Sequence, residues 1–327
     1  YFPESKVLEG MFGLVKDLYQ ITITSSEEGP ALQFWHPDVK FFSIKDTNEK
    51  LIGQFYIDLY ARPGKQGGAW MDDAVTRRRI ENNIQTPVAY LNCNFAKPVN
   101  VSGQIRPALF THDEVITLFH EFGHGWHHLL TQVEELGVSG INGVEWDAVE
   151  VPSQYLENFW WEWDVLSGMT QHIDSGASLH RKLFDKMIAA KNINSGTKGL
   201  QQVFYGILDF TLNDGYDPDG DKSSTELVMQ LQNAITLYPY QKGTHQQASF
   251  GHLNGYGAAY YGYKWSEVYA HDMFSIFKEK GILDPKTGLR YRKIILEKGG
   301  TIDPLDLVKE FLGRHPNSDA FLRSMGI

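Results

Sequence analysis

The sequence of 327 residues is poor in cysteine, in long apolar runs and in positive charge. Cys93 is its single cysteine, so no disulfide can form within the chain, and a reducing compartment is expected. No apolar run reaches the roughly 18 residues that a membrane-spanning helix needs. The 30 Lys and Arg stand against 40 Asp and Glu, whereas a general nucleic-acid-binding protein needs clustered positive charge. We therefore expect neither a membrane nor a nucleic acid as a partner.

The start of the chain lacks two further features. "YFPESKVLEG" contains no initiator Met, and it has no basic region followed by the apolar stretch of a signal peptide. We expect either a processed chain or part of a longer protein.

Apolar residues make up 42% of the chain and aromatic residues 13%, which is enough for a sizeable core. A helical stripe over residues 7–18 precedes β-forming segments at 31–60 and 86–95, and helical spacing prevails after residue 111. We predict a mainly α fold with a small mixed β-sheet (α+β). Residues 1–110 would form a helix and the sheet, and residues 111–327 would be helical. Cys93 lies in the apolar strand segment, where a buried structural thiol is favoured over a nucleophile.

The stretch "FHEFGHGWHHLL", residues 119–130, contains four histidines. We expect it to lie on a helix that begins at a Thr or Asp cap. Residues four apart share one helix face, so the imidazoles of His120 and His124 can both reach one Zn²⁺. Glu121 would then project beside the metal, where a carboxylate can take a proton from a metal-bound water.

Other interpretations of this stretch remain open. His124 and His128 have the same spacing, but Gly125 occupies the position where a base would be needed. His127 lies too far along the helix from His120 to complete a tetrahedral site. We predict that His127 and His128 lie on the helix surface or beside the ligands. A packed histidine helix without metal is the alternative to a zinc site.

A catalytic zinc usually takes three protein ligands, so a third ligand must come from elsewhere. The loop "GVSGING", residues 137–143, lets the chain reverse and bring "GVEWDAVEVPSQYLEN" beside the histidine helix. Asp147 and Glu150 are the candidates there. Spacing alone does not separate them.

The segment "SFGHLNGYGAAYYGYKW", from Ser249, can supply the hydrogen-bond donors that peptide hydrolysis needs at its oxyanion. Phenols and imidazole are suitable donors. The candidates are His252, Tyr256, Tyr260, Tyr261 and Tyr263. From the residues alone, packing of these rings in an aromatic core is the favoured alternative.

Segments across the whole chain resemble the thimet oligopeptidase and oligopeptidase A family of zinc metallopeptidases. The resemblance is carried by "FHEFGHGWHHLL", "EWDAVEVPSQYLENFWWE", "YFPESKVLEGMF", "GGAWMDD", "TPVAYLNCNF", "LFTHDEVITLFHEFGH", "FDKMIAAKN" and "YYGYKWSEVY". It implies a zincin-like catalytic region, with the HExxH helix set in a largely helical oligopeptidase lobe. Because members of the family are longer, it also implies that residues 1–327 form a catalytic region corresponding to the C-terminal half of a longer protein.

The resemblance also implies roles for individual residues. The glutamate of the family's VE-x-PSQ segment is a zinc ligand, and it falls on Glu150. The family's His–Gly–Tyr segment lines the cleft opposite the zinc. Its positions fall on His252, Tyr256, Tyr260 and Tyr263. In one departure, a single glycine precedes the first tyrosine where many relatives have two. The shorter "GYGA" form resembles the mitochondrial intermediate peptidase branch.

The implied function is that of a zinc-dependent endopeptidase, an oligopeptidase that hydrolyses short peptides with one Zn²⁺ per chain. Glu121 is then the general base toward a zinc-activated water, and Tyr263 or Tyr260 with His252 steadies the oxyanion. The N-terminal half of the longer protein is expected as the partner that supplies the opposite wall of the substrate channel. A cytoplasmic location is expected, with an organelle left open.

Two alternatives belong to the same family. A dipeptidyl carboxypeptidase would need a fixed cation for the carboxylate at the substrate's C-terminus, and the sequence identifies none. A catalytically impaired fragment that lacks the N-terminal half is the other, and the intact Glu121 argues against it. We further expect an extended substrate to pair with a sheet edge around Gly67 and Gly68. Asp147 or Glu157 would orient a ligand histidine.

Overall fold

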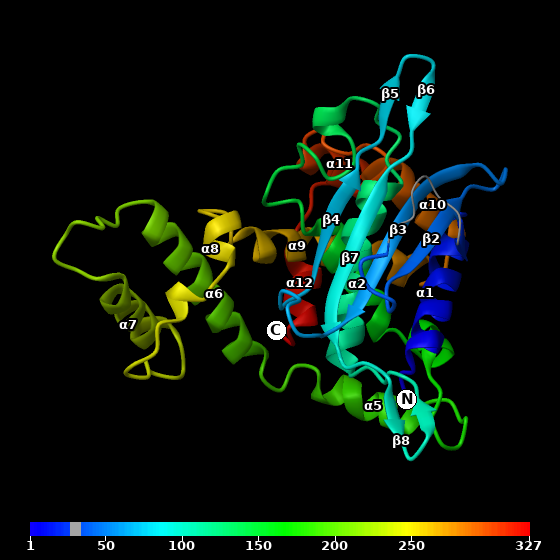
Figure 1. Ribbon diagram of the computed structural model, residues 1–327. Coiled ribbons are helices and arrows are strands. Elements are labelled where there is room, and N and C mark those ends of the chain that lie inside the picture. The colour runs from blue at the N-terminus through cyan, green and yellow to red at the C-terminus, as the bar shows by residue number, and fades with distance from the viewer. Residues whose placement is uncertain (27–33) are drawn as a thin grey trace.

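The computed structural model describes residues 1–26 and 34–327, and its centre is a five-stranded mixed sheet (Figure 1). In spatial order the strands are β1 (Thr22–Ser25), β2 (Lys40–Lys45), β3 (Leu51–Tyr60), β7 (Val88–Phe95) and β4 (Trp70–Val75). Strands β3 and β7 run parallel, and the other neighbouring pairs are antiparallel. The start of the predicted β segment, residues 31–33, lies outside the described residues.

Strand β7 lies between β3 and the edge strand β4, and its apolar residues alternate. Ala89, Leu91, Cys93 and Phe95 are buried, and the residues between them are partly exposed. Successive side chains of a strand point to opposite faces, so one face of β7 turns to the core. Burial raises the pKa of the Cys93 thiol well above its usual range. The prediction of a buried thiol is confirmed.

Two hairpins extend beyond opposite ends of this sheet (Figure 1). They consist of β5 (Arg78–Ile80) with β6 (Asn83–Gln85), and of β8 (Val99–Val101) with β9 (Gln104–Arg106).

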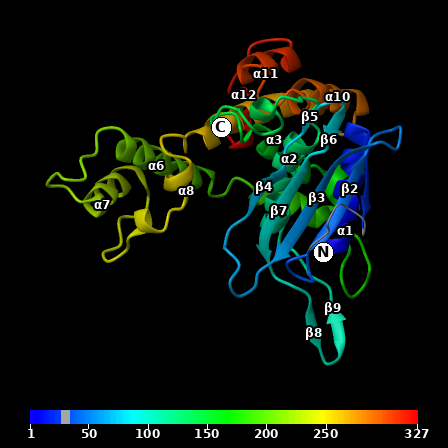
Figure 2. The same cartoon turned by 45° about the horizontal axis from the view of Figure 1, so that its top comes forward.

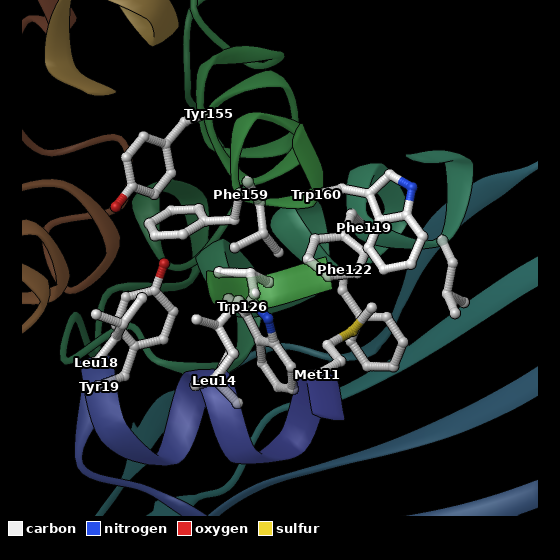
Figure 3. Close-up of a cluster of buried hydrophobic side chains, with 14 of the residues drawn as sticks. Met11, Leu14, Leu18, Tyr19, Phe119, Phe122, Trp126, Tyr155, Phe159 and Trp160 are labelled. Atoms are coloured by element: carbon white, nitrogen blue, oxygen red, sulfur yellow. The ribbon is translucent and has the colours of Figure 1, made fainter. Parts of the chain in front are cut away.

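Helices α1 (Glu4–Tyr19) and α2 (His112–Leu129) pack on one face of the sheet. The ring centroid of Phe55 in β3 lies 6.3 Å from that of Phe12 in α1. It lies 5.7 Å from the ring centroids of both Phe122 and Trp126 in α2. Figure 3 shows side chains of α1 and α2 meeting in this core. The contact fixes α2, which carries the histidine stretch, against the sheet.

Helix α2 begins where its sequence predicts. The Thr111 hydroxyl accepts a hydrogen bond from the Glu114 backbone N–H at 3.1 Å, and the Glu114 carboxylate accepts one from the Thr111 N–H at 2.7 Å. This reciprocal capping box satisfies two N–H groups at the start of the helix.

The rest of the chain is mainly helical. The remaining α-helices are α3 (Val151–Glu157), α4 (Trp163–Leu166), α5 (Arg181–Ala190), α6 (Ser195–Asn213), α7 (Ser224–Ile235), α8 (His252–Gly255), α9 (Gly262–Lys280), α10 (Pro285–Tyr291), α11 (Pro304–Leu312) and α12 (Asp319–Ser324). The predicted fold class, mainly α with a small mixed sheet, is confirmed. Among the described residues, no helix combines the length and apolar character needed to cross a membrane.

Helices α6 and α7 form an arm that projects from the body around the sheet (Figures 1 and 2). The arm has a small apolar cluster of its own, made of Phe204, Leu208, Leu227 and Val228. It is therefore packed internally, apart from the main core.

Residues 151–169, in the part of the chain where helical spacing prevails, do not form one continuous helix. Helix α3 ends at Glu157, and two short 3-10 turns flank α4. The Asn158 side chain donates to the backbone carbonyl of Gln154 at 2.9 Å, and such side-chain bonds compete with helix continuation. The break turns Phe159 and Trp160 into the core with Tyr155, where Figure 3 shows them.

Candidate active site

Three donor atoms from two helical segments converge at the centre of the site. His120 and His124 lie one turn apart on α2, and the Nε2 atom of each is 3.1 Å from Oε2 of Glu150. The three donor atoms all lie within 4.8 Å of one another. The fold thus brings together the three residues that the sequence and the resemblance predicted as zinc ligands.

Glu150 reaches this point because α3 starts there and packs closely on α2. Glu150 is the N-cap of α3, and Pro152 occupies the first turn, where its missing N–H costs nothing. The Ser153 hydroxyl lies 3.0 Å from Oε2 of Glu150 and holds that carboxylate. Asp147, the other candidate, is occupied elsewhere: its Oδ2 accepts a hydrogen bond from the Tyr261 hydroxyl at 3.0 Å. The contacts thus separate two carboxylates that spacing could not.

The chemistry of the donor set fits a Zn²⁺ ion. Two imidazole nitrogens and one carboxylate oxygen are the ligands of one common class of catalytic zinc sites, which leaves a position open for water. Nδ1 of His120 lies 2.6 Å from Oε1 of Glu157. A proton on that nitrogen leaves Nε2 free to bind a metal. Burial disfavours a charge on His120, but the carboxylates of Glu150 and Glu157 outweigh burial and raise its pKa well above the usual range. The site therefore attracts a cation.

Glu121 lies beside the three donors in a dry environment. Its side chain is 4% exposed, and Oε2 has no hydrogen-bond partner among the described residues. Burial raises the pKa of this carboxyl above its usual value. A raised pKa suits a carboxylate that must accept a proton and return it.

The segment from His252 to Tyr263 lies opposite the three donors and forms what we call the tyrosine wall. His252 is on α8, Tyr256 follows that helix, and Tyr263 lies in the first turn of α9. The ring centroids of Tyr256 and Tyr263 are 5.4 Å apart, and that of His252 is 5.6 Å from Tyr256 and 5.7 Å from Tyr263. The Tyr256 hydroxyl donates to Oε1 of Glu150 at 2.8 Å. This bond links the wall directly to the donor set.

Tyr260 belongs to the same ring cluster but faces another way. Its ring centroid lies 5.1 Å from that of Tyr263. Its hydroxyl donates to Oε1 of Gln202 on α6 at 3.1 Å, and it does not line the cavity. The structure therefore places Tyr260 behind the wall, and its predicted contact with the oxyanion stays a prediction.

The protonation states of this wall suit hydrogen-bond donation. Burial raises the pKa of Tyr256 and of Tyr263 above the usual range, and it raises that of Tyr260 to about 12. All three phenols thus keep their protons at neutral pH. Desolvation by its neighbours lowers the pKa of His252, so its imidazole is neutral.

A cavity of about 640 Å³ lies between these elements. It is lined by Ala69, Trp70, Met71, His120, Glu121, His124, Ile141, Asn142, Gly143, Val144, Trp146, Val149, Glu150, His252, Tyr256 and Tyr263. Its volume is in the range of sites that bind small ligands. The edge strand β4, the histidine helix and the tyrosine wall thus face one space.

The sheet edge lies slightly further along the chain than the sequence predicted. Gly67 and Gly68 lie in the loop before β4, and the carbonyl of Gly68 accepts a hydrogen bond from the Asn94 side chain at 2.8 Å. Strand β4, which starts at Trp70, is the edge strand and supplies lining residues of the cavity. The expected edge is therefore β4 rather than the glycine turn.

Of the two positions predicted for His127 and His128, on the helix surface or beside the ligands, the surface position is wrong. The two side chains are 3% and 0% exposed. Nε2 of His128 lies 3.0 Å from the carbonyl oxygen of Val75 in β4, so His128 joins α2 to the edge strand. The helix is buried on more than one face because it lies between the sheet and α3, which spacing within one helix cannot reveal.

Sequence reasoning missed two glutamines that support the tyrosine wall. Nε2 of Gln154 on α3 donates to the backbone carbonyl of Tyr263 at 2.9 Å, and Gln202 accepts from Tyr260. Both contacts join segments more than fifty residues apart in the chain. Gln154 lies in the quoted VEVPSQ segment, which is the one signal that could have pointed to it.

Comparisons with known proteins agree over the full length of the chain. The family model described as peptidase family M3 matches residues 1–327. Oligopeptidase A from Escherichia coli (strain K12) is 47% identical over 100% of this chain and 48% of the relative. Organellar oligopeptidase A from Arabidopsis thaliana is 38% identical over 100% of this chain and 42% of the relative.

A solved structure, PZ peptidase A with inhibitor 2, shares the fold. Its TM-score is 0.54 at 15% identity, over 83% of this chain and 42% of that chain. The chain spans about half the length of the curated relatives it matches.

Proposed function

The chain belongs to peptidase family M3, and from this premise we propose that it is a zinc-dependent endopeptidase that hydrolyses short peptides. The observation that carries the proposal is the position of Glu121, a buried carboxylate beside the converging donors of His120, His124 and Glu150. These three residues would hold one Zn²⁺. When bound, the ion would polarise the scissile carbonyl and lower the pKa of water.

The protein's own residues supply the proton transfers. Glu121 accepts a proton from the attacking water as the water oxygen bonds to the carbonyl carbon. It then delivers this proton to the leaving nitrogen as the C–N bond breaks. The second proton of the water ends on the same nitrogen, so the products are a carboxylate and an ammonium group and no further reactant is needed. Burial raises the pKa of Glu121 and so favours the uptake of the proton, which the more basic leaving nitrogen then removes.

The tyrosine wall stabilises the charge that develops on the carbonyl oxygen. Tyr263 lines the cavity with a protonated hydroxyl, and His252 lines it as a neutral donor. Tyr256 also keeps its proton, which it donates in a hydrogen bond to Glu150. Donors fixed in advance in a partly dry site stabilise an oxyanion more than water does. Glu157 holds the ring of His120 by its Nδ1 atom and so keeps Nε2 directed at the metal position.

The edge strand β4 offers a template for the substrate. Trp70 and Met71 of this strand line the cavity next to Glu121. An extended peptide can pair with an exposed sheet edge through its backbone, which gives affinity with little dependence on sequence. We also propose that the other half of the length seen in relatives closes the channel and restricts it to short peptides. The 48% share of the Escherichia coli relative supports this.

Exchange of Glu121 for glutamine tests the proposed reaction. The change keeps the shape of the side chain and removes the base, so kcat on quenched-fluorescence peptides should fall by about 10²- to 10⁴-fold. The content of bound zinc should stay that of the wild type. Glu145→Gln, at an exposed glutamate near the cavity, is the matched control and should keep full activity. A wild type that binds zinc but cleaves no peptide of any length would refute the proposal.

One observation favours a second candidate function, that of a dipeptidyl carboxypeptidase. A second cavity, of about 460 Å³, is lined by Lys191 and Lys198, and also by Gln154 and Glu157, which contact Tyr263 and His120. Neither lysine has a carboxylate within ion-pair distance among the described residues. The Lys191 ammonium lies 4.5 Å from the ring centroid of Trp161. In this second proposal, Lys191 or Lys198 would be the cation that binds the carboxylate at the substrate's C-terminus.

Peptide pairs with a free or an amidated C-terminus separate the two candidates. If the second function holds, the wild type releases C-terminal dipeptides and prefers the free acid by about tenfold, the value of one charge-assisted hydrogen bond. Lys191→Met should then abolish the preference. If cleavage sites do not depend on the C-terminus, the endopeptidase proposal stands alone.

A further inference from the structure

A buried carboxylate of the arm holds the turn that carries the tyrosine wall. Asp209 lies on α6 and is 0% exposed. Its Oδ1 accepts a hydrogen bond from the backbone N–H of Ala258 at 3.0 Å, and its Oδ2 accepts one from the N–H of Tyr260 at 2.9 Å. The two oxygens thus grip alternate N–H groups of one turn, about fifty residues further along the chain.

No cation within ion-pair distance neutralises this carboxylate in the part of the chain that the structure describes. Its remaining partner is Asn213, whose Nδ2 donates to Oδ1 at 3.0 Å. A buried charge is costly unless it is hydrogen-bonded. N–H groups that donate to a carboxylate form strong, directional bonds. The two backbone bonds are therefore the main interactions that keep Asp209 buried.

The turn that is hydrogen-bonded to Asp209 has a strained backbone, which the carboxylate can stabilise. Ala258 has a φ of 58°, in the left-handed region that residues other than glycine seldom adopt. Such a conformation persists only where the surroundings fix it. The backbone N–H groups of Ala258 and Tyr260 both donate to Asp209. These two bonds hold the strained residue and the residue two positions after it. Tyr256 and Tyr263 lie at the two ends of this turn.

The turn is also tied to the body of the protein. The Tyr256 hydroxyl donates to Glu150, the Tyr263 carbonyl accepts from Gln154, and the Tyr261 hydroxyl donates to Asp147. The tyrosine wall is therefore hydrogen-bonded on both sides. Asp209 of the arm holds one side, and the segment that supplies Glu150 holds the other.

We propose that Asp209 is a positioning residue that sets the hydroxyls of Tyr256 and Tyr263 against the donor set and couples the arm to the site. This inference rests on the proposed function and adds a residue that touches neither substrate nor metal. Because the turn is bonded to Asp209, we expect a movement of α6 to shift the tyrosine wall. The arm has its own apolar cluster, so its folding does not depend on this carboxylate alone.

Asp209→Asn tests the proposal with little change in volume. The amide must present an NH₂ group to one of the two backbone N–H donors, so at least one bond is lost. We expect kcat to fall by about 10- to 100-fold, with KM changed by less than about threefold and with zinc content unchanged. Asp214→Asn is the matched control, because Asp214 is exposed at the end of the same helix and should be neutral.

A combined variant separates positioning from general damage. In a Tyr256→Phe/Tyr263→Phe background, Asp209→Asn should lower kcat by less than about threefold further, because the hydroxyls it positions are already gone. A full additional loss would overturn the proposal. If Asp209→Asn does not fold, Asn213→Ala removes only the third donor and should show a smaller loss with the same lack of additivity.

Amide hydrogen exchange tests the coupling without any substrate. In Asp209→Asn, exchange should accelerate by about tenfold or more in the peptide that covers 256–263, and it should stay unchanged in α2. This readout keeps its meaning even if the wild type proves to have no peptidase activity. Unchanged exchange in 256–263 would refute the positioning role, whatever the activity.

Discussion

The hydroxyls of Tyr263 and Tyr260 have different surroundings although their ring centroids are 5.1 Å apart. Tyr263 lines the cavity, whereas Tyr260 donates to Gln202 behind it. Tyr263→Phe should therefore lower kcat by about 100-fold, the order found for loss of one oxyanion donor. Tyr260→Phe should lower kcat by less than about tenfold. Rates on one quenched peptide, at saturating and at low concentration, provide the comparison.

Zinc content is the control for this pair, since neither phenol is a ligand and both variants should bind metal as the wild type does. Equal losses in the two variants would show that the Tyr260 hydroxyl reaches the reaction after all. A larger loss in Tyr260→Phe would contradict the assignment of Tyr263.

At the residue scale, helix periodicity offered two histidine pairs, and the position of Glu121 favoured His120 with His124 over His124 with His128. The choice of Glu150 over Asp147 needed the resemblance, because the turn before α3 makes sequence spacing uninformative. In the structure the choice rests on contacts that spacing does not encode: Ser153 holds Glu150, and Tyr261 holds Asp147. Asp209 had no signal at all, since an aspartate on a helix is usually solvated.

Close packing of α2 on α3 allows Glu150 to reach the histidines. A Cβ on Gly123 would lie 2.4 Å from Cα of Ser153 and 2.5 Å from the carbonyl oxygen of Pro152. Both are backbone atoms and cannot rotate away. Gly123→Ala should therefore displace α3, lower the free energy of unfolding by about 1–3 kcal/mol and weaken zinc binding by about 10- to 100-fold. Calorimetric titration with Zn²⁺ and thermal unfolding measure the two effects.

Gly125, half a turn further along the same helix, is the matched control. A Cβ there would lie 3.2 Å from Cδ2 of Leu91, the end of a flexible side chain that can shift. Gly125→Ala should leave zinc affinity within about threefold of the wild type. If the two alanine variants bind zinc equally well, close packing at Gly123 is not what positions Glu150.

The burial of His127 on α2 predicts a dependence of stability on pH. Burial, with the neighbouring His124 and His128, lowers the pKa of His127 to about 3. Between pH 6.5 and about 3 the unfolded chain therefore binds a proton that the folded chain does not. The free energy of unfolding should fall as the pH is lowered through this window, by up to about 1.4 kcal/mol per pH unit from this residue.

Denaturant unfolding of the metal-free protein at several pH values between 7 and 4 measures this slope. His127→Leu should flatten it, whereas His315→Leu, at an exposed histidine, should leave it unchanged. An identical slope in the wild type and in His127→Leu would show that His127 takes up its proton while folded.

At the scale of elements, the sequence predicted the existence of helices better than their ends. The Thr111 cap of α2 could be predicted because both partners of the capping box lie within four residues. The break after Glu157 could not, because it depends on Phe159 and Trp160 turning into a core formed with α1. The edge strand was expected around Gly67 and Gly68, but it covers Trp70–Val75. Its pairing with β7 begins at Trp70, and the sequence alone does not show this pairing.

At the scale of the molecule, the cavity lies between three parts that are far apart in sequence. Strand β4 forms one side, helices α2 and α3 hold the donors, and the segment from His252 to Tyr263 closes the other side. The resemblance indicated the second and third parts. The projecting arm could not be predicted, because the helical spacing of α6 and α7 does not reveal whether these helices pack on the main core or project from it (Figure 2).

The central claim is that His120, His124 and Glu150 together hold one Zn²⁺. The most direct test is the zinc content of the purified protein, with two carboxylate variants compared in parallel. We predict about one Zn²⁺ per chain in the wild type and in Asp147→Asn, and loss of bound zinc in Glu150→Gln. Zinc retained in Glu150→Gln at the wild-type level, or lost in Asp147→Asn instead, would contradict the account.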